Sequence, residues 1–511
     1  MVYNMNILSS DFFLRATRNI VIALSLYFII IYIFLAMIRM PYQYELDWIE
    51  GGLVDHVYRM VNGLPLYCEP TVEYVPFVYT PLFFYLSTIV AFFTGVGFLP
   101  LRLVSFACSI LSMLLLYSMV HRETRSRFAS LLTIGIYCSC FAITGALYDT
   151  GRVDSLVLFL ILMVFYLYRY SKGLFFNILI GFTIVAAFLT KQYGITIFIP
   201  LIIYSIIVNW KRGLTILVST IVFLVGITYV QDIFYHGWYS YWTLILPFFV
   251  FNTTYEFSRL LFYWTQDIMG VLPISLLMMI CYFIFTNYKK ENNQVFYLII
   301  ALSLILGSMP NRLILYGVLN AVTPTYVALA LMTGLSISKI YGLINNIEKV
   351  DVRNRITIFI LSGLIIQFAM CLYSPRVYIP TQNDILDRNA IVTMTRNANG
   401  DVFNPCRGYY NSLAEKNTSA HLGALIDIIQ IVNDPVGEKL RNEFIEKIQK
   451  QEYSMMVLNK FWIVTLPDMH KIIEQYYYKP ESTKENMTEY VLKNGKANME
   501  TYIYMPKNIN N

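Results

Sequence analysis

Acidic side chains gather in the first polar segment of the chain, between Arg39 and Thr80. Within this segment, Asp47 and Glu50 stand three residues apart, a spacing that puts both carboxylates on one side of a helical turn. Paired carboxylates can raise one pKa enough for proton transfer, so either residue is a candidate general base. A merely solvated acidic loop has the same pattern, and the spacing alone does not separate the two interpretations.

Four basic side chains stand beside the ends of apolar segments, namely Arg102, Arg152, Lys191 and Arg312. A cation at mid-membrane costs about 2.5–3.5 kcal/mol to insert, so a phosphate or a carboxylate is expected to compensate it. Arg152 is close enough to Asp154 in sequence to form an ion pair with it. Each cation alone is also explained as an interfacial side chain that extends its charge to the surface. Arg312, just before Gly317, suits an anion seat at a helix start or a plain turn at the membrane surface.

The composition is typical of a membrane protein. Of 511 residues, 57% are hydrophobic and only 14% are charged, which is more apolar than a soluble domain tolerates. Apolar windows long enough to cross a hydrocarbon core of about 30 Å recur between Asn19 and Leu372. Because the charges crowd into short loops, the formal net charge of +6 describes loop topology, and we expect no nucleic-acid partner.

Cysteine usage argues against a structural metal. The seven cysteines form no CxxC pair and no set with histidines at zinc-ligand spacing. We therefore predict no metal ligands and no cofactor, and the residues leave the use of a divalent ion open.

Loop charge sets the expected topology. Arg15 and Arg18 precede the first apolar run, which places that side in the cytoplasm by the positive-inside rule. If the apolar segment 81–97 lies along or dips into the outer leaflet instead of crossing, all later basic loops fall inside as well. The stretch Leu53–Val61 is amphipathic and is predicted to be a short helix lying on the membrane. About eleven crossings follow, at 19–38, 101–120, 128–147, 154–168, 174–190, 194–209, 214–231, 268–286, 294–309, 321–341 and 354–373.

The predicted fold is an all-α polytopic membrane bundle over residues 1–373, with membrane-surface helices in the first external loop. From about Ser374 the hydropathy falls and helical and strand-like runs alternate, including Ala424–Val432 and Tyr453–Val464. We expect a small extracytoplasmic α/β domain over residues 374–511, because an odd number of crossings exports the C-terminal part.

The order of these motifs resembles the GT-C superfamily of integral membrane glycosyltransferases, which includes the protein O-mannosyltransferases and the aminoarabinose transferases of lipid A. That family has an acidic motif in the first external loop, a second in the next, and an arginine after a glycine-containing stretch. The matching positions here are Asp47 with Glu50, Arg152 with Asp154, and Arg102 after Gly95-Val96-Gly97. Shorter strings fit as well, namely Glu50-Gly51, Gly63-Leu64-Pro65-Leu66-Tyr67, Tyr79-Thr80-Pro81-Leu82, Thr190-Lys191-Gln192 and Tyr316-Gly317-Val318-Leu319-Asn320. The resemblance covers roughly residues 19–340. The usual acidic pair is adjacent, whereas Asp47 and Glu50 are separated, which leaves the base open between them.

The resemblance implies transfer of a sugar from a polyprenyl-phosphate donor to an acceptor on the non-cytoplasmic face, usually with inversion. It implies catalytic roles for Asp47, Glu50 and Asp154, phosphate binding by Arg102, Arg152, Lys191 and Arg312, and substrate contacts by Glu45, Tyr79, Gln192, Tyr316 and Asn320. The acceptor, whether glycan, lipid or protein, is not specified, and the expected location is a bacterial inner or plasma membrane. A flippase or transporter of lipid-linked sugars is an alternative, and the long external stretch Gln231–Trp264 also keeps an O-antigen-type ligase open.

Overall fold

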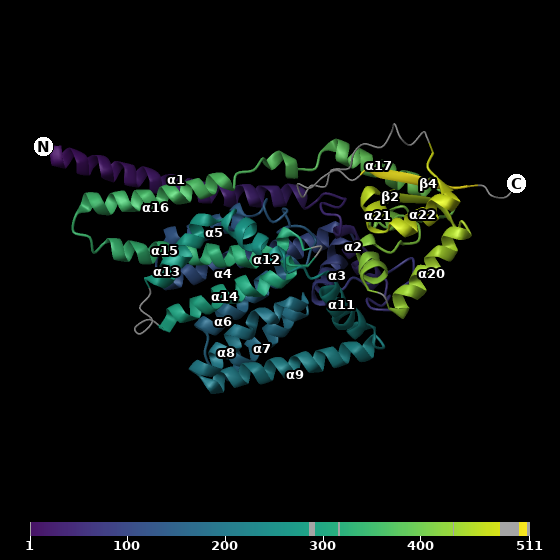
Figure 1. Cartoon of the computed structure of the whole chain (residues 1–511), viewed down its shortest axis with the longest axis horizontal. Coiled ribbons are helices and arrows are strands. Elements are labelled where there is room, and N and C mark those ends of the chain that lie inside the picture. The colour runs from purple at the N-terminus through teal and green to yellow at the C-terminus, as the bar shows by residue number, and fades with distance from the viewer. Residues whose placement is uncertain (1, 286–291, 315–316, 433, 481–499, 508–511) are drawn as a thin grey trace.

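The computed structural model describes residues 2–285, 292–314, 317–432, 434–480 and 500–507. Long helices run side by side, with the N-terminus at one end of them and a smaller mixed domain at the other (Figure 1). The helices α2, α3 and α11 lie near the junction between these two parts. The chain is therefore mostly helical with a small C-terminal sheet, as the sequence predicts.

Eleven helices in the described ranges match the eleven predicted apolar runs. They are α1 (Val2–Arg39), α4 (Phe98–Thr124), α5 (Arg127–Ser139), α6 (Asp154–Tyr170), α7 (Leu174–Phe188), α8 (Ile199–Val208), α9 (Trp210–Phe234), α13 (Pro273–Ile284), α14 (Asn292–Arg312), α15 (Thr323–Ile344) and α16 (Val350–Met370). Within the described residues, six helices are long and apolar enough to cross a membrane, and a helix pair bent by 93° at the start of α13 adds a seventh candidate. A polytopic membrane bundle is thereby confirmed.

The remaining short helices lie between the long ones. They are α2 (Glu50–Val61), α3 (Leu82–Thr94), η1 (Gln192–Gly194), η2 (Thr196–Phe198), α10 (Trp238–Ser240), η3 (Tyr241–Ile245), α11 (Leu246–Thr254), α12 (Arg259–Phe262), η4 (Tyr263–Met269), η5 (Leu319–Val322) and η6 (Pro375–Tyr378). Of these, η3 and η4 are π-helical and the other η segments are 3₁₀ helices.

The segment that contains α2 and α3 begins and ends at the same end of the bundle. Nη1 of Arg102, in the first turns of α4, donates to the carbonyl oxygen of Arg39, the last residue of α1, at 3.1 Å. We call this end, where α1 ends and α4 begins, the domain end, and the opposite end, where α4 ends and α5 begins, the distal end. The chain thus returns to the end that it left, as expected if 81–97 lies along or dips into the outer leaflet; the place of α3 in the membrane stays a prediction.

The amphipathic helix in the first loop forms, but its expected place on the membrane surface is wrong. In α2, the residues from Glu50 to Val57 are all buried, and Val54 of the apolar face is fully enclosed by protein. That face packs against α3 and α4. On another side, a Cβ on Gly51 would lie only 2.3 Å from the carbonyl oxygen of Gly408, so the helix also touches the C-terminal domain backbone to backbone. An apolar helix face fits protein as well as lipid, and hydropathy does not distinguish them.

The C-terminal domain surrounds a four-stranded sheet of order β1-β2-β4-β3. Strands β1 and β2 are parallel, whereas β4 is antiparallel to both β2 and β3. The predicted run Tyr453–Val464 divides into β2 and α21, and Ala424–Val432 is helical. The elements are α17 (Gln382–Asn397), β1 (Asp401–Phe403), α18 (Tyr410–Leu413), α19 (Leu422–Leu425), the π-helical η7 (Ile426–Ile431), α20 (Pro435–Gln449), β2 (Tyr453–Asn459), α21 (Lys460–Thr465), α22 (Pro467–Tyr476), β3 (Tyr477–Tyr478) and β4 (Thr501–Pro506).

The C-terminal domain shares its apolar core with the first loop. One buried cluster joins Leu53 and Phe83, from α2 and α3, to Phe403 and Trp462 of the C-terminal domain. A separate large cluster fills the helical bundle. Because the first loop and the C-terminal domain bury their apolar side chains against each other, they form one packing unit at the domain end.

Asp55 links these two parts and predicts a pH dependence of stability. Its Oδ2 accepts a hydrogen bond from the backbone N–H of Tyr409 at 3.0 Å, and burial raises its pKa to about 8. An unfolded aspartate titrates near about 3.9, so between about pH 4 and pH 8 the folded protein binds the extra proton and stability falls as pH rises. Asp55→Asn keeps an acceptor for Tyr409 and cannot ionise. We expect it to raise the melting temperature in detergent at pH 8 more than at pH 5, by roughly 2–4 °C per kcal/mol recovered.

Asp468→Asn is the matched control, since Asp468 lies on α22 with 73% of its side chain exposed. The same loss of charge there should leave the difference between the two pH values unchanged. An equal response of both variants would contradict the role assigned to Asp55.

Candidate functional site

The most enclosed ion pair of the domain end joins α4 to the start of α2. Nε and Nη2 of Arg102 donate to Oε1 and Oε2 of Glu50, both at 2.8 Å, and neither side chain is exposed. The same guanidinium donates to the backbone carbonyls of Arg39, Tyr42 and Tyr44. Arg102 thereby engages all five of its N–H donors, so it holds the end of α1, the following segment and α4 in one arrangement.

Glu50 is equally saturated. In addition to Arg102, Oε2 accepts from the backbone N–H of Leu46 at 2.8 Å, and Oε1 accepts from that of Gly151 at 2.7 Å. A side chain at Gly151 would meet Oε1 of Glu50 at 3.1 Å, which explains a glycine at this contact. Each carboxylate oxygen thus accepts two hydrogen bonds from protein donors. Glu50 therefore has a structural role and is not available to a ligand.

A second buried pair, Arg39 with Asp149, supports the same corner and was not predicted. Nη1 of Arg39 lies 3.2 Å from Oδ1 of Asp149, and Nη2 donates to the carbonyl of Ala146 at 2.9 Å. Arg39 is the last residue of α1, and basic residues are common at the ends of membrane helices. Its partner Asp149 lies 110 positions later, so no local sequence pattern predicts the pair.

A connected network of charges lies beside these pairs. Nη1 of Arg152 donates to Oδ2 of Asp47 at 2.6 Å, and its Nε donates to Oδ2 of Asp154 at 3.3 Å, which confirms the predicted pairing of Arg152 with Asp154. Oδ1 of Asp154 accepts from Nζ of Lys191 at 2.9 Å and from Nδ2 of Asn320 at 3.1 Å. Five of the predicted site residues, from four separate segments of the chain, are therefore brought together.

This network is less enclosed than the Arg102 pair, and its two cations have N–H groups that make no hydrogen bond. The exposed fraction of the side chain rises from 4% for Asp47 and 6% for Arg152 to 15% for Lys191. Within the described part of the chain, Nη2 of Arg152 and two N–H groups of the Lys191 ammonium have no hydrogen-bond acceptor, and the ammonium also lies over the ring of Tyr193. Burial alone would lower the pKa of Lys191, but Asp154 outweighs it and raises that pKa above its usual range, so the ammonium stays charged.

The expectation of a carboxylate pair at Asp47 and Glu50 is wrong in its geometry. Asp47 precedes α2, whereas Glu50 is its first residue, and the two carboxylates turn to different arginines, Arg152 and Arg102. Each carboxylate is held by an opposite charge, so the two do not share a proton as a paired acid would.

Arg312 takes a different place from the predicted one. It is the last residue of α14 and therefore stands at a helix C-terminus, where the backbone offers carbonyls and no anion seat. Its Nε and Nη2 donate to the carboxylate of Asp267 at 2.7 and 3.3 Å. Tyr316, predicted as a substrate contact, lies outside the described residues.

The other predicted substrate contacts have different surroundings. Glu45 lies 3.6 Å from Nη1 of Arg407, in the C-terminal domain. The half-buried side chain of Gln192 donates to the carbonyls of Val78 and Thr243 at 2.5 and 3.0 Å. Tyr79 is half-buried, and its ring lies against that of Phe77.

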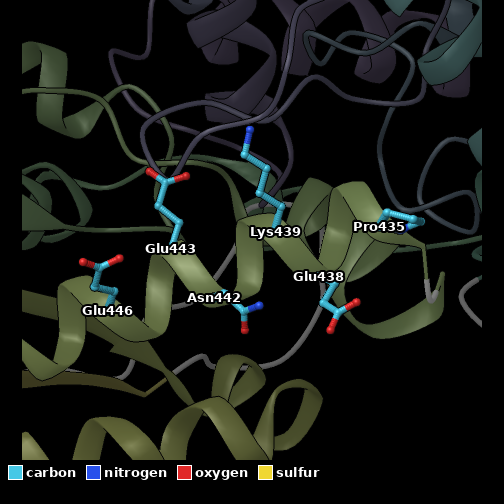
Figure 2. A pocket seen from close by; sticks show the side chains of 6 residues that line it. All are labelled: Pro435, Glu438, Lys439, Asn442, Glu443 and Glu446. Atoms are coloured by element: carbon cyan, nitrogen blue, oxygen red, sulfur yellow. The ribbon is translucent and has the colours of Figure 1, made fainter.

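A surface hollow along α20 does not suit an anionic donor. It is lined by Pro435, Glu438, Lys439, Asn442, Glu443 and Glu446, which are drawn as sticks in Figure 2. Its one cation, Lys439, is bound to Glu69 at 2.5 Å. Among the residues that the structure describes, no three His, Cys, Asp or Glu side chains gather as a metal-binding group.

Two kinds of comparison relate the chain to known proteins. A family model described as dolichyl-phosphate-mannose-protein mannosyltransferase matches residues 78–239. This range contains Arg102, Arg152, Asp154 and Lys191 but begins after Asp47. No curated protein is similar enough in sequence to count as a match.

The fold is that of solved membrane glycosyltransferases. The structure of ArnT from Cupriavidus metallidurans bound to undecaprenyl phosphate is similar with a TM-score of 0.58 and 10% identity, over 94% of this chain and 97% of that one. Apo ArnT gives a TM-score of 0.56 at the same identity and coverage. The apo oligosaccharyltransferase of Archaeoglobus fulgidus gives 0.53 at 12% identity, over 91% of this chain and 73% of that one. The chain has the GT-C fold.

Within the GT-C fold, the charges of the domain end divide into two sets. Arg102, Glu50, Arg39 and Asp149 are wholly or nearly enclosed and hold segments together. Asp47, Arg152, Asp154, Lys191 and Asn320 form the candidate functional site. The sequence alone did not separate these sets, because both consist of the same residue types at the same helix ends.

The enclosed set predicts a large loss of stability from one neutral substitution. Glu50→Gln removes one charge and leaves Arg102 buried without compensation, which typically costs about 3–5 kcal/mol. We expect a lower melting temperature and a lower yield of folded protein in detergent. The double variant Glu50→Gln, Arg102→Met should be damaged by less than the sum of the single variants, because the two side chains interact directly.

Glu446→Gln serves as the control, since Glu446 pairs with Lys450 in water with 62% of its side chain exposed. Because water screens such an exposed pair, the melting temperature of this variant should stay close to that of the unmodified protein. Equal stability of Glu50→Gln and Glu446→Gln would refute the structural role of the Arg102 pair.

Proposed function

We propose that the protein is a membrane glycosyltransferase that moves a hexosyl or pentosyl group from a polyprenyl-phosphate donor to an acceptor on the non-cytoplasmic face. The observation that carries the proposal is the network of Asp47, Arg152, Asp154 and Lys191, in which a base candidate and two cations with unused donors stand together at the domain end. The GT-C fold and the matching family model support it.

In the proposed reaction, the acceptor hydroxyl oxygen attacks the anomeric carbon while the bond from that carbon to the phosphate oxygen breaks. Asp47 takes the hydroxyl proton, and polyprenyl phosphate leaves with the bonding electron pair. Glu50 is the weaker base candidate, because its oxygens already accept four hydrogen bonds and it is fully buried.

Lys191 and Arg152 are the proposed phosphate ligands. Their unused N–H groups can donate to the phosphate oxygens as negative charge grows on the leaving group. Asp154 and Asn320 hold these cations in place, and Asp154 is assigned this role instead of proton transfer because it accepts from Arg152, Lys191 and Asn320 together. Arg102 and Arg312 are assigned to structural pairs. The proposed reaction uses no cofactor.

The proposed topology has eleven crossings, one for each of the eleven helices that overlap the predicted apolar runs, with the domain end outside. Contacts between helix ends support one common distal end, since Arg169 in the last turn of α6 lies 2.9 Å from Glu123 at the end of α4, and Arg212 in α9 donates to the carbonyl of Tyr168 at 2.6 Å. Basic residues concentrate in these distal loops, as the positive-inside rule expects of a cytoplasmic face. A bacterial inner membrane is the proposed location.

Labelling with a membrane-impermeant maleimide tests this orientation. Position 127 is the first residue of α5, at the distal end, and position 468 lies on α22 of the C-terminal domain; both are exposed, and each is changed to cysteine in turn (Arg127→Cys, Asp468→Cys). We expect intact cells to be labelled at position 468 and not at position 127, which should become reactive only after the cells are permeabilised. The unmodified chain gives the background from its own seven cysteines. Labelling of position 127 in intact cells would reverse the topology.

Transfer of radiolabelled sugar from polyprenyl phosphate in membranes tests the base. Asp47→Asn keeps the shape of the side chain but cannot accept a proton, so kcat should fall by about 10²–10⁴-fold, the usual contribution of a general base. The KM for the donor should change much less, because Arg152 and Lys191 remain.

Asp232→Asn is the matched control, because Asp232 lies at the domain end of α9 and caps the turn at Ser240, outside the network. It should keep near-normal kcat. Unchanged kcat in Asp47→Asn would remove Asp47 as the base. Movement of the labelled donor across the membrane without transfer of its sugar would favour the flippase alternative.

A further inference from the structure

The segment just before Asp47 is part of the core of the C-terminal domain. Tyr44 and Leu46 are buried, and their side chains join a cluster with residues of α17, α18 and the sheet, namely Ile391, Val402, Tyr410, Met455, Val457 and Ile503. Between them, Glu45 faces Arg407 of the same domain. The chain that leads to Asp47 is therefore anchored in a domain that begins more than 300 residues later in the sequence.

The segment just after Asp47 is anchored on its other side. Glu50 is fixed by Arg102, and the next residue, Gly51, touches the backbone of Gly408 so closely that either glycine excludes a Cβ. Only the short stretch from Asp47 to Ile49 lies between these two anchors. The Asp47 carboxylate at its start pairs with Arg152, so the orientation of the backbone that follows depends on whatever binds its peptide groups.

His421 of the C-terminal domain binds this stretch directly. Its Nε2 lies 2.9 Å from the carbonyl oxygen of Trp48, and its Nδ1 lies 3.0 Å from the backbone N–H of Gly423. Because Gly423 can only donate and the Trp48 carbonyl can only accept, the ring is the neutral tautomer with its proton on Nε2. The imidazole is 3% exposed and also lies against the rings of Trp48 and Phe77, so it has one available orientation.

We propose that His421 is a positioning residue of the transfer reaction, which holds the Trp48 carbonyl and thereby sets the direction of the Asp47 carboxylate. The inference rests on the proposed function, in which Asp47 is the general base. The C-terminal domain is then part of the active site. Since both anchors survive the loss of this one hydrogen bond, a change at His421 releases the peptide at Trp48 without unfolding the loop.

Two variants of His421 separate positioning from general stability. Leucine at this position cannot donate, whereas the side-chain amide of glutamine can donate from about where Nε2 lies. His421→Leu should lower kcat by roughly 10- to 100-fold, the effect expected when a catalytic group is displaced by about 1 Å, with little change in the donor KM. His421→Gln should recover most of the lost kcat.

His470→Leu is the control, because His470 is another largely buried histidine of the same domain and pairs with Glu474 at 3.2 Å, on α22. It should leave kcat unchanged. Hydrogen–deuterium exchange gives a second readout that needs no activity. Peptides covering residues 44–52 should exchange faster in His421→Leu than in the unmodified protein, and as slowly as normal in His421→Gln and His470→Leu.

The outcomes distinguish this inference from the proposed function. If the unmodified protein transfers no sugar but exchange in residues 44–52 rises in His421→Leu alone, the proposed function fails and the contact stands. If the unmodified protein is active and His421→Leu has normal kcat and normal exchange, His421 is not a positioning residue. Equal loss of kcat in the leucine and glutamine variants would also overturn the inference.

Discussion

Arg102 carries a positive charge into a part of the molecule that excludes water, where the charge is tolerated only with a full set of acceptors. Glu50 supplies the opposite charge, and the carbonyls of Arg39, Tyr42 and Tyr44 take the remaining donors. Breaking any of these contacts would leave a buried donor or charge unpaired, which is costly. The end of α1, the start of α2 and the first turns of α4 are therefore held in one geometry, and the loop that bears Asp47 follows from it.

Asp47 and Glu50 both carry a carboxylate, but their different surroundings give one a candidate catalytic role and the other a structural role. Glu50 has four donors and no exposure, whereas Asp47 lies in a network whose exposure increases toward Lys191. Buried charges that are fully paired stabilise a structure or its specificity, but they have nothing left to offer a ligand. Cations that keep unused donors at a partly open edge can bind another anion. The number of unused hydrogen-bond donors on the cations thus distinguishes the structural ion pairs from the candidate functional site.

Hydropathy and loop charge were enough to predict the helical framework, because lipid imposes both constraints on every crossing segment. They also predicted that the chain returns after α3 to the end where α1 finishes, as the contact between Arg102 and Arg39 shows. They failed for α2, whose apolar face at Val54 meets protein and not lipid. Burial of an apolar helix face is favourable in lipid and in a protein core, so the sequence does not distinguish these two environments.

The sequence predicted most of the residues of the candidate site, but it did not predict which side chains contact each other. Arg152 and Asp154 are neighbours in sequence and their pairing was foreseen, but Glu50 and Arg102 are 52 positions apart and His421 reaches Trp48 across 373. A buried histidine in a polar domain most often satisfies its own surroundings, and no local pattern indicates that its hydrogen bond reaches a loop between the first helices. Such a contact appears only when the C-terminal domain folds onto the first loop. Because each part supplies apolar surface that the other must bury, the site exists only in the folded whole.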